Sequence, residues 1–497
     1  MAASDNLTLI KHKILNRHGP LHVSGLARLL EATESTLNAI DYVDRHYVLS
    51  ITNSAGVATA RLPRRLVPLI AAAYIAGPSE EFRQRVNAKL WQFAPADGSR
   101  PLATLPINVA IWRLAGLGEE VVPQMRDTEF SDYRKSDVLH YSRAVSAVKF
   151  GVLDDQTAAD FATAVYAQAC PNRNIVMGWL KYDWRINGTT LEGRAELKRL
   201  VKNEPRLSTS TLMFMASYFC DAGEYDYALI LLNIARLQSK SAWSSHRYVA
   251  NTHLLVEQGL LNSTWAIKEA QLFKRFNAQQ SDFGSLIRRN LNSFALVANG
   301  QRQTGLGTGP LIDSKNVVIR MNSARPDGRF AADYGWKQNV WVKNTPNYDV
   351  KRLEKLGGIE MVLLSGKNPL YHEANIGPLL QELMDTYPSV SSIPDQFTRQ
   401  TIAATKRNPS SGLVMLTWLQ HLAGELQDQR NVFGYGLSDQ KTREASHYFR
   451  DKPVISHHTH SWPAERKYYD SIVKPHELGG KGLCAYVSSL WPLKATR

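Results

Sequence analysis

Cysteine is scarce in this chain of 497 residues, which contains only Cys170, Cys220 and Cys484. Small secreted domains held by disulfides use cysteine far more densely, and cysteine metal sites need ligands a few residues apart. The three cysteines here lie far from one another in the sequence. This usage excludes a disulfide framework and a cysteine-based zinc site, and it fits a protein that folds in a reducing compartment.

Long apolar runs are also missing. The chain has no stretch of about 18 consecutive apolar residues, the length that a membrane-spanning helix requires. Its first residues lack the apolar core of a signal peptide. We therefore expect a cytoplasmic protein. The net charge of +14 favours anionic partners, so binding to the inner membrane face or to a partner protein is a further expectation.

The length predicts two or three domains. Residues 1–60 predict a small helical unit, in which residues 23–40 look like a helix-turn-helix. This segment carries few of the basic side chains that DNA phosphates require, so nucleic acid is disfavoured as a partner. A plain helical hairpin is the preferred interpretation of these residues.

Residues 61–290 have mainly helical periodicity and contain two similar helix–turn–helix segments. Their turn glycines, Gly223 and Gly259, are about 36 residues apart, near the period of tetratricopeptide repeats. A glycine ends the first helix of each pair, and a small alanine allows the second helix to pack closely. This region either binds a partner or packs against the domain that follows it, and the pattern leaves both open.

Residues 291–497 alternate between strand and helix patterns. Strands are expected at residues 294–298, 317–319, 359–364 and 431–434, and a helix at 377–384. This order predicts an α/β domain with a mostly parallel, Rossmann-like sheet. Asn299 and Asn322 follow the first two strands, beside a glycine-rich loop. Ligands bind at such carboxyl ends, although the glycine spacing argues against a dinucleotide.

Four ordered motifs in this second half resemble those of the animal-type sialyltransferases, which transfer sialic acid from CMP-sialic acid with inversion. The large sialylmotif corresponds to Asn299-Gly300, Asp313, Arg320-Met321-Asn322 and Asp333-x-Gly335. The small motif corresponds to Ser410-Ser411-Gly412, the third motif to His447-Tyr448, and the terminal motif to His460 and Glu465. The preceding residues have no counterpart in that family. A Rossmann-like glycosyltransferase domain is therefore implied for residues 291–497.

The resemblance implies a role for each matched residue. His460 is the general base that takes the acceptor proton, because an imidazole titrates near neutral pH. His447 stabilises the departing phosphate. The nucleotide-binding residues are Asn299, Gly300, Asn322, Ser410, Ser411 and Gly412. The residues that orient the site are Arg320, Tyr448 and Glu465. The partners implied are a CMP-sugar donor and a glycan or glycolipid acceptor.

The chain also departs from that family. It lacks the cysteines of the family's disulfide, and it has no Asp-x-Asp to hold a metal, so we expect no metal and no cofactor. Changes around Asn299 leave the donor open between sialic acid and another ulosonic acid such as Kdo. The leading hypothesis is transfer in bacterial surface-polysaccharide assembly. The alternatives are a helical-repeat interaction protein with a relic nucleotide-binding domain, and a nucleic-acid-binding protein.

Overall fold

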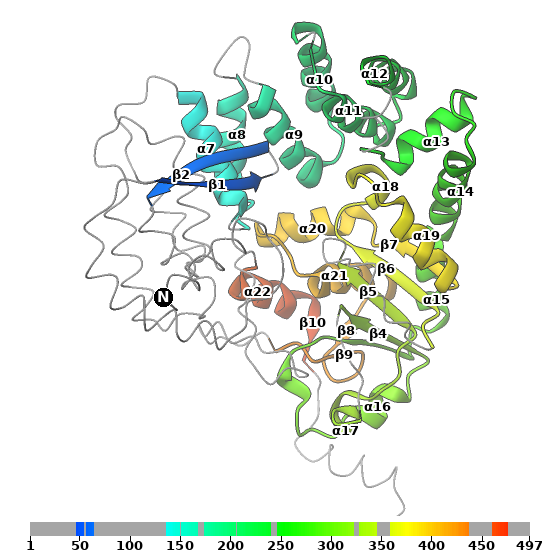
Figure 1. The fold of residues 1–497 in the computed structure, drawn as a ribbon. Coiled ribbons are helices and arrows are strands. Elements are labelled where there is room, and N and C mark those ends of the chain that lie inside the picture. Colours follow the sequence, from blue (N-terminus) through cyan, green and yellow to red (C-terminus); the bar gives the residue numbers. More distant parts are fainter. Residues whose placement is uncertain are drawn as a thin grey trace, which may run out of the picture.

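The structure is a computed structural model, and it describes ten segments of the chain (Figure 1). These segments are residues 46–53, 56–63, 136–149, 151–166, 173–204, 206–239, 246–322, 328–344, 358–436 and 460–475. The expected helix-turn-helix at residues 23–40 lies outside them. None of the helices within these segments combines the length and the apolar character that a membrane span requires.

The end of the expected N-terminal helical unit is a β hairpin. Strands β1 (His46–Asn53) and β2 (Gly56–Pro63) pair antiparallel, with Asn53 opposite Gly56. Tyr47, Val48 and Ile51 belong to residue types that favour strands, and a two-residue connection is a common hairpin turn. The helical prediction is therefore wrong for residues 46–53 and 56–60, which form strands.

From residue 136 to residue 289 the described secondary structure is helical. Its α-helices are α7 (Ser136–Lys149), α8 (Asp155–Tyr166), α9 (Arg173–Asn187), α10 (Leu191–Asn203), α11 (Thr209–Asp221), α12 (Tyr225–Gln238), α13 (Val249–Glu257), α14 (Thr264–Ala278) and α15 (Asp282–Arg289). Figure 1 shows α7 to α14 arching over α18, α19 and α20 of the α/β part. A core of buried side chains runs through the first seven of these helices.

The two predicted helix pairs are present. Helix α11 pairs with α12 through Gly223, and α13 pairs with α14 through Gly259. Both glycines have positive φ, +73° and +66°, which only glycine adopts at little cost. Cys220 of α11 is buried and is a free thiol. Membership of the tetratricopeptide class stays a prediction.

A six-stranded parallel sheet forms the centre of the second part, as predicted. Its strands are β3 (Phe294–Val297), β4 (Val317–Met321), β5 (Val340–Asn344), β6 (Met361–Ser365), β7 (Ser389–Ser392) and β9 (Val432–Phe433). Their order is β7-β6-β5-β4-β3-β9, and every pairing is parallel. Strands β5 and β7 were not expected from the sequence. A short parallel pair, β8 (Leu426–Gln427) and β10 (Val473–Lys474), lies outside this sheet.

Helices cover both faces of the sheet, which explains why its strands are buried and apolar. One face packs against α15, α20 (Asp395–Thr405), α21 (Ser411–Ala423) and α22 (Trp462–Ile472). The other face packs against α14 and α19 (Gly377–Thr386) at one end, and against the short helices α16 (Gly309–Asp313) and α17 (Ala331–Tyr334) at the other.

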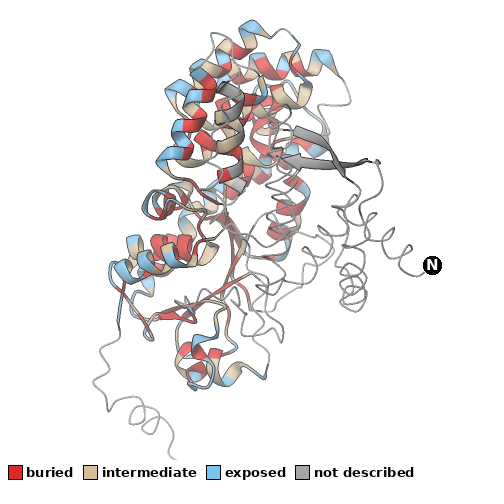
Figure 2. Cartoon of the chain, turned by 90° about the vertical axis from the view of Figure 1, so that its left-hand side faces the viewer, coloured by how far each residue is buried: buried red, intermediate tan, exposed pale blue. Residues whose placement is uncertain are grey.

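Figure 2 shows buried residues running continuously from the helices into the sheet. Helices α14 and α15 precede residue 290 in the sequence, yet both contribute side chains to the cores on the sheet. The helical region and the sheet therefore share their hydrophobic cores.

Candidate active site

The direction of the chain across the sheet reverses beside β3. From β3 the chain runs outward through β4, β5, β6 and β7, and it later returns to place β9 on the other side of β3. Open α/β sheets bind ligands at the carboxyl ends of the strands where this reversal occurs. The residues after β3 and after β9 therefore form the floor of the candidate site.

The backbone of the turn after β3 lies directly against the backbone of the turn after β9. A Cβ atom on Gly300 would lie 2.6 Å from the Gly434 oxygen and from the Gly436 nitrogen. Only glycine permits so close an approach. Asn299 donates from Nδ2 to the Met321 oxygen at 3.3 Å, and its buried Oδ1 accepts no hydrogen bond from the residues that the structure describes. That oxygen is a buried side-chain acceptor at the reversal point without a donor among the described residues.

Asn322 directly follows β4 and has a positive φ of 47°, which asparagine tolerates. Its side-chain oxygen accepts from the Asn344 N–H at 3.0 Å, and its carbonyl accepts from Trp341 Nε1 at 2.7 Å. Both contacts tie the ends of β4 and β5 together. Arg320 is fully buried and donates to the carbonyls of Tyr334 and Lys337, at 2.6 Å and 2.9 Å. Asn322 and Arg320 thus hold the loops around the site.

The backbone of the glycine-rich loop donates hydrogen bonds to a side chain of the protein itself. The Asp333 carboxylate accepts from the N–H groups of Gly305 and Gly307, each at 2.8 Å. Asp333 thus occupies these two backbone donors of the loop. The Tyr334 hydroxyl donates to the Gly300 carbonyl at 2.8 Å. The loop is therefore a support for the Asn299–Gly300 turn.

The small motif forms the start of α21, which lies beside the end of β9. The Tyr435 hydroxyl donates to the Gly412 carbonyl at 2.8 Å, and burial raises the pKa of Tyr435 well above its ordinary value. Ser410 caps the helix by accepting from the Leu413 N–H. In the described part of the chain, the N–H groups of Ser411 and Gly412 have no hydrogen-bond acceptor. These two donors remain available at the positive end of the helix dipole.

Ser410 itself is engaged by Glu465 of α22. Glu465 accepts from the Ser410 N–H and from its hydroxyl, both at 2.7 Å, and its side chain is almost completely buried. Burial raises the pKa of Glu465 to about 7, and the two hydrogen bonds oppose this shift. Glu465 therefore joins the small motif to the terminal motif. Ser410 belongs to this junction, so its donors are occupied, whereas the N–H groups of Ser411 and Gly412 are not, among the residues that the structure describes.

His460 lies at the same junction, five residues before Glu465 in the sequence. Its Nδ1 is 2.8 Å from the Asn408 carbonyl oxygen. A carbonyl can only accept, so the hydrogen sits on Nδ1 and the lone pair on Nε2. Burial lowers the pKa of His460 from 6.5, the hydrogen bond to Asn408 opposes the shift, and the charge of Arg185 adds to it. The imidazole is neutral at pH 7 and can accept a proton at Nε2.

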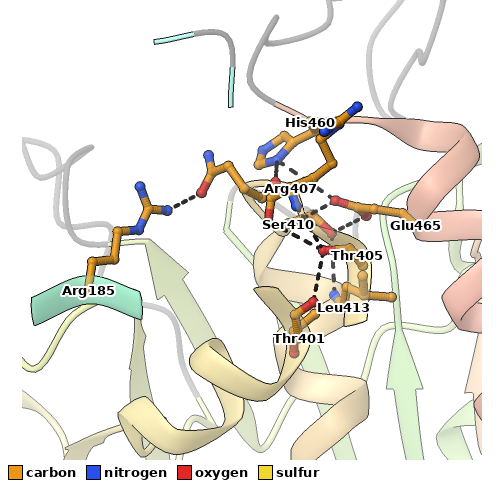
Figure 3. Close-up of polar contacts among 9 residues, drawn as sticks. Arg185, Thr401, Thr405, Arg407, Ser410, Leu413, His460 and Glu465 are labelled. Atoms are coloured by element: carbon orange, nitrogen blue, oxygen red, sulfur yellow. Dashed lines mark hydrogen bonds and ion pairs between the residues drawn. The ribbon is translucent and has the colours of Figure 1, made fainter. Parts of the chain in front are cut away.

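A residue of the helical region reaches this site. Arg185 of α9 donates from Nη2 to the Asn408 side-chain oxygen, and Asn408 is the residue whose carbonyl accepts from His460 (Figure 3). The sequence contained no signal for this contact, because Arg185 and Asn408 are 223 residues apart. Asp333, Tyr334 and Tyr435 were also missed as supporting residues, although the first belongs to the large motif.

His447 and Tyr448 lie outside the described residues. Within the described segments, no group of three or more His, Cys, Asp or Glu side chains is close enough to hold a metal ion. Among the predicted site residues, the contacts described above bring together His460, Glu465, the small motif and the turns that carry Asn299 and Asn322.

Residues 240–363 match the sequence model of glycosyltransferase family 29 (sialyltransferase). The resemblance to the sialyltransferase family is confirmed. The match includes the large motif and ends before Ser410 and His460. A 64-residue segment is also 39% identical to Sialyltransferase-like protein 2 of Oryza sativa subsp. indica, which is 13% of this chain and 16% of that relative's length. This chain therefore matches only a small part of the length of that relative.

Two solved structures of a mammalian sialyltransferase also align with the chain. One is described as the enzyme itself, and the other is in complex with Gal-beta-1-3GalNAc-ortho-nitrophenol. They are 16% and 17% identical, and each alignment covers 46% of this chain and 84% of the other. The TM-score of 0.31 is too low to support an argument about function.

Proposed function

We propose that this chain is an inverting glycosyltransferase. It moves sialic acid, or a related ulosonic acid such as Kdo, from a CMP-sugar to a hydroxyl of a glycan or glycolipid acceptor. The observation that carries the proposal is the state of His460, whose Nδ1 is tied to the Asn408 carbonyl while Nε2 keeps its lone pair. A relic domain has no need to keep this arrangement, so it favours an active enzyme.

The chemistry is a single displacement. The acceptor hydroxyl gives its proton to His460 Nε2, and its oxygen bonds to the anomeric carbon. The bond from that carbon to the phosphate oxygen breaks on the opposite face, and CMP leaves with the electron pair. Inversion follows because attack and departure occur on opposite faces.

The donors for the nucleotide come from the start of α21 and the turn after β3. The N–H groups of Ser411 and Gly412 would bind the phosphate, where the helix dipole adds to the hydrogen bonds. Asn299 and Gly300 would face the nucleotide from the floor of the site. His447 is assigned to the leaving phosphate by the family motif alone. No metal or cofactor enters this proposal. A role in bacterial polysaccharide assembly and a cytoplasmic location stay predictions.

A ligand screen tests the nucleotide. CMP, CDP, UDP and NAD are added separately, and the melting temperature is measured. A ligand at 100 times its Kd stabilises the folded state by about 2.7 kcal/mol, so CMP should raise the melting temperature. Stabilisation by UDP or NAD without stabilisation by CMP would contradict the proposal. Incubation with CMP-sialic acid or CMP-Kdo should then give a product of inverted anomeric configuration, read by NMR.

A further inference from the structure

A short segment between α20 and α21 pairs with the helical region through its backbone. The Leu153 N–H donates to the Lys406 carbonyl at 3.0 Å. The Asn408 N–H donates to the Gly151 carbonyl at 2.8 Å. These two bonds flank an antiparallel bridge between the two segments. We call residues 406–408 the connector, and its backbone partner is the turn between α7 and α8.

Two side chains of the helical region also bind the connector. The Asp155 carboxylate at the start of α8 lies 2.7 Å from Lys406 Nζ. Arg185 of α9 donates to the side-chain oxygen of Asn408. The connector is therefore held from three places in the helical region, which are the turn between α7 and α8, the start of α8, and α9.

Lys406 has an unusual backbone conformation. Its φ of 54° lies in the left-handed region, which costs free energy for a residue other than glycine. Such a conformation persists where the surrounding structure holds it. Leu153 and Asp155 both bind Lys406. One turn earlier in α20, Ile402 is buried in the core of the helical region. The helical region therefore sets the direction in which the chain leaves α20.

Helix α9 is well packed where it carries Arg185. The ring centre of Trp184, the preceding residue, lies 3.7 Å from the ring centre of His372 in α18 (Pro369–His372). Trp184 Nε1 also donates to Asp221 of α11 at 2.8 Å. These contacts hold α9 between α18 and α11, so the Arg185 guanidinium reaches the connector from a firmly packed helix.

Asn408 joins these contacts to the candidate active site. Its carbonyl accepts from His460 Nδ1 at 2.8 Å, so the lone pair of the neutral ring lies on Nε2 (Figure 3). Its N–H and its side-chain oxygen both bind partners in the helical region, Gly151 and Arg185. The orientation of the Asn408 carbonyl therefore depends on the helical region. Without this acceptor, the neutral ring can carry its hydrogen on either nitrogen.

We propose that the helical region positions the proposed base, by holding Asn408 so that its carbonyl keeps the hydrogen of His460 on Nδ1 and leaves Nε2 free to accept a proton. Arg185 is then a positioning residue, because its hydrogen bond reaches His460 through Asn408. The inference rests on the proposed function and gives the helical region a part in it.

The tautomer of His460 is measured first, by ¹⁵N NMR of the full chain above the pKa of this imidazole, where the ring is neutral. Loss of the signal in His460→Ala assigns it, and the wild-type ring should carry its hydrogen on Nδ1. Arg185→Met removes the donor to Asn408, and Asn408→Ala removes the side-chain oxygen but keeps the carbonyl. Each should raise the ratio of the Nε2–H form to the Nδ1–H form about tenfold, the size that one hydrogen bond accounts for.

A double variant and a control separate positioning from stability. Arg185→Met and Asn408→Ala remove the two ends of one contact, so the double variant should have the same tautomer ratio as either single variant. Arg194→Met removes an arginine of α10 that pairs with Glu224 at 2.9 Å, and it should leave the ratio unchanged. Additive effects of the two substitutions, or an unchanged ratio in Arg185→Met, overturn the proposal.

Turnover with CMP-sialic acid then tests the consequence for the reaction, at a pH where His460 is neutral. Arg185→Met should lower kcat by the same factor as the population of the Nδ1–H form. The donor KM should stay unchanged, because Ser410 remains bound to Glu465. Arg194→Met and Lys274→Gln break other ion pairs of the helical region and should change neither constant.

A higher donor KM with unchanged kcat in Arg185→Met overturns the proposal. The tautomer measurement needs no turnover. If the wild-type protein neither binds CMP nor transfers sugar, the proposed function fails, and the tautomer ratios still decide whether the helical region orients His460.

Discussion

The Glu465 carboxylate accepts hydrogen bonds from both donors of Ser410, its N–H and its hydroxyl. Oε1 lies 2.7 Å from the Ser410 nitrogen, and Oε2 lies 2.7 Å from its hydroxyl oxygen. This pair of contacts fixes the start of α21 against the first turn of α22. Since His460 lies just before Ser461, the N-cap of α22, the same pair sets the position of the proposed base relative to the proposed nucleotide donors.

Glu465→Ala should strongly destabilise the fold. It leaves the Ser410 N–H and hydroxyl without their buried acceptor, and each such loss costs about 1–3 kcal/mol. We expect a loss of about 2–5 kcal/mol in the free energy of unfolding, measured by urea denaturation. Glu425→Ala, which removes an exposed carboxylate paired with Lys474, is the control and should change little. Equal free energies of unfolding for the two variants would show that the contacts between Glu465 and Ser410 do not stabilise the fold.

The raised pKa of Glu465 predicts a pH dependence of stability. The carboxyl titrates near 4.5 when unfolded and at about 7 when folded, so the folded state binds the extra proton between these values. The stabilisation is complete below pH 4.5 and is lost as the pH rises to 7. The slope approaches about 1.4 kcal/mol per pH unit within this window. Glu465→Gln cannot titrate, so the stability of wild type minus variant should fall from pH 5 to pH 7. A difference that grows with pH would refute the assignment.

His460→Ala should abolish transfer and leave CMP affinity nearly unchanged. The base lies on the acceptor side, and its removal typically lowers the rate by about 10²–10⁴. His447→Ala should weaken CMP binding about tenfold, because a hydrogen bond to a charged phosphate is worth about 1.5–3 kcal/mol. Single-turnover rates and calorimetric CMP affinities measure the two effects. Near-normal turnover in His460→Ala, or reversed effects on CMP, would disprove the roles.

Arg185→Gln should shift the acid limb of the pH–rate profile to higher pH. The charge of Arg185 lowers the pKa of His460, so its loss raises that pKa and the base is deprotonated only at higher pH. Gln keeps an amide that can donate to Asn408. The profile of kcat/KM for a neutral acceptor reports the shift, and Lys274→Gln should leave it in place. An unshifted profile with a uniformly lower rate would indicate a purely structural role for Arg185.

EDTA should leave both CMP binding and transfer intact. The chain has no Asp-x-Asp, and cationic and helix-end donors are assigned to the phosphate instead. The measurement is the initial rate with EDTA and after addition of Mg²⁺ or Mn²⁺. Loss of activity with EDTA and its recovery with either metal would show that the reaction uses a metal.

Local patterns were enough for much of the α/β part. Apolar runs bounded by turn residues predicted β3, β4, β6 and β9, because buried parallel strands are continuously apolar. Strand β7 was missed since its sequence is Ser389-Val390-Ser391-Ser392, and these serines are buried only because the strand pairs with β6. The hairpin at residues 46–63 was missed because a short alternating pattern competes with helical spacing over the same residues.

The sequence by itself predicted the candidate site residues, since the order of the motifs points to His460, Glu465 and the small motif. It could not show that Glu465 occupies the donors of Ser410, or that Asp333 occupies those of the glycine loop. It also could not bring Arg185 to Asn408. Those contacts join residues far apart in the chain, and only the packing of α9 against α18 and α20 decides which side chains meet.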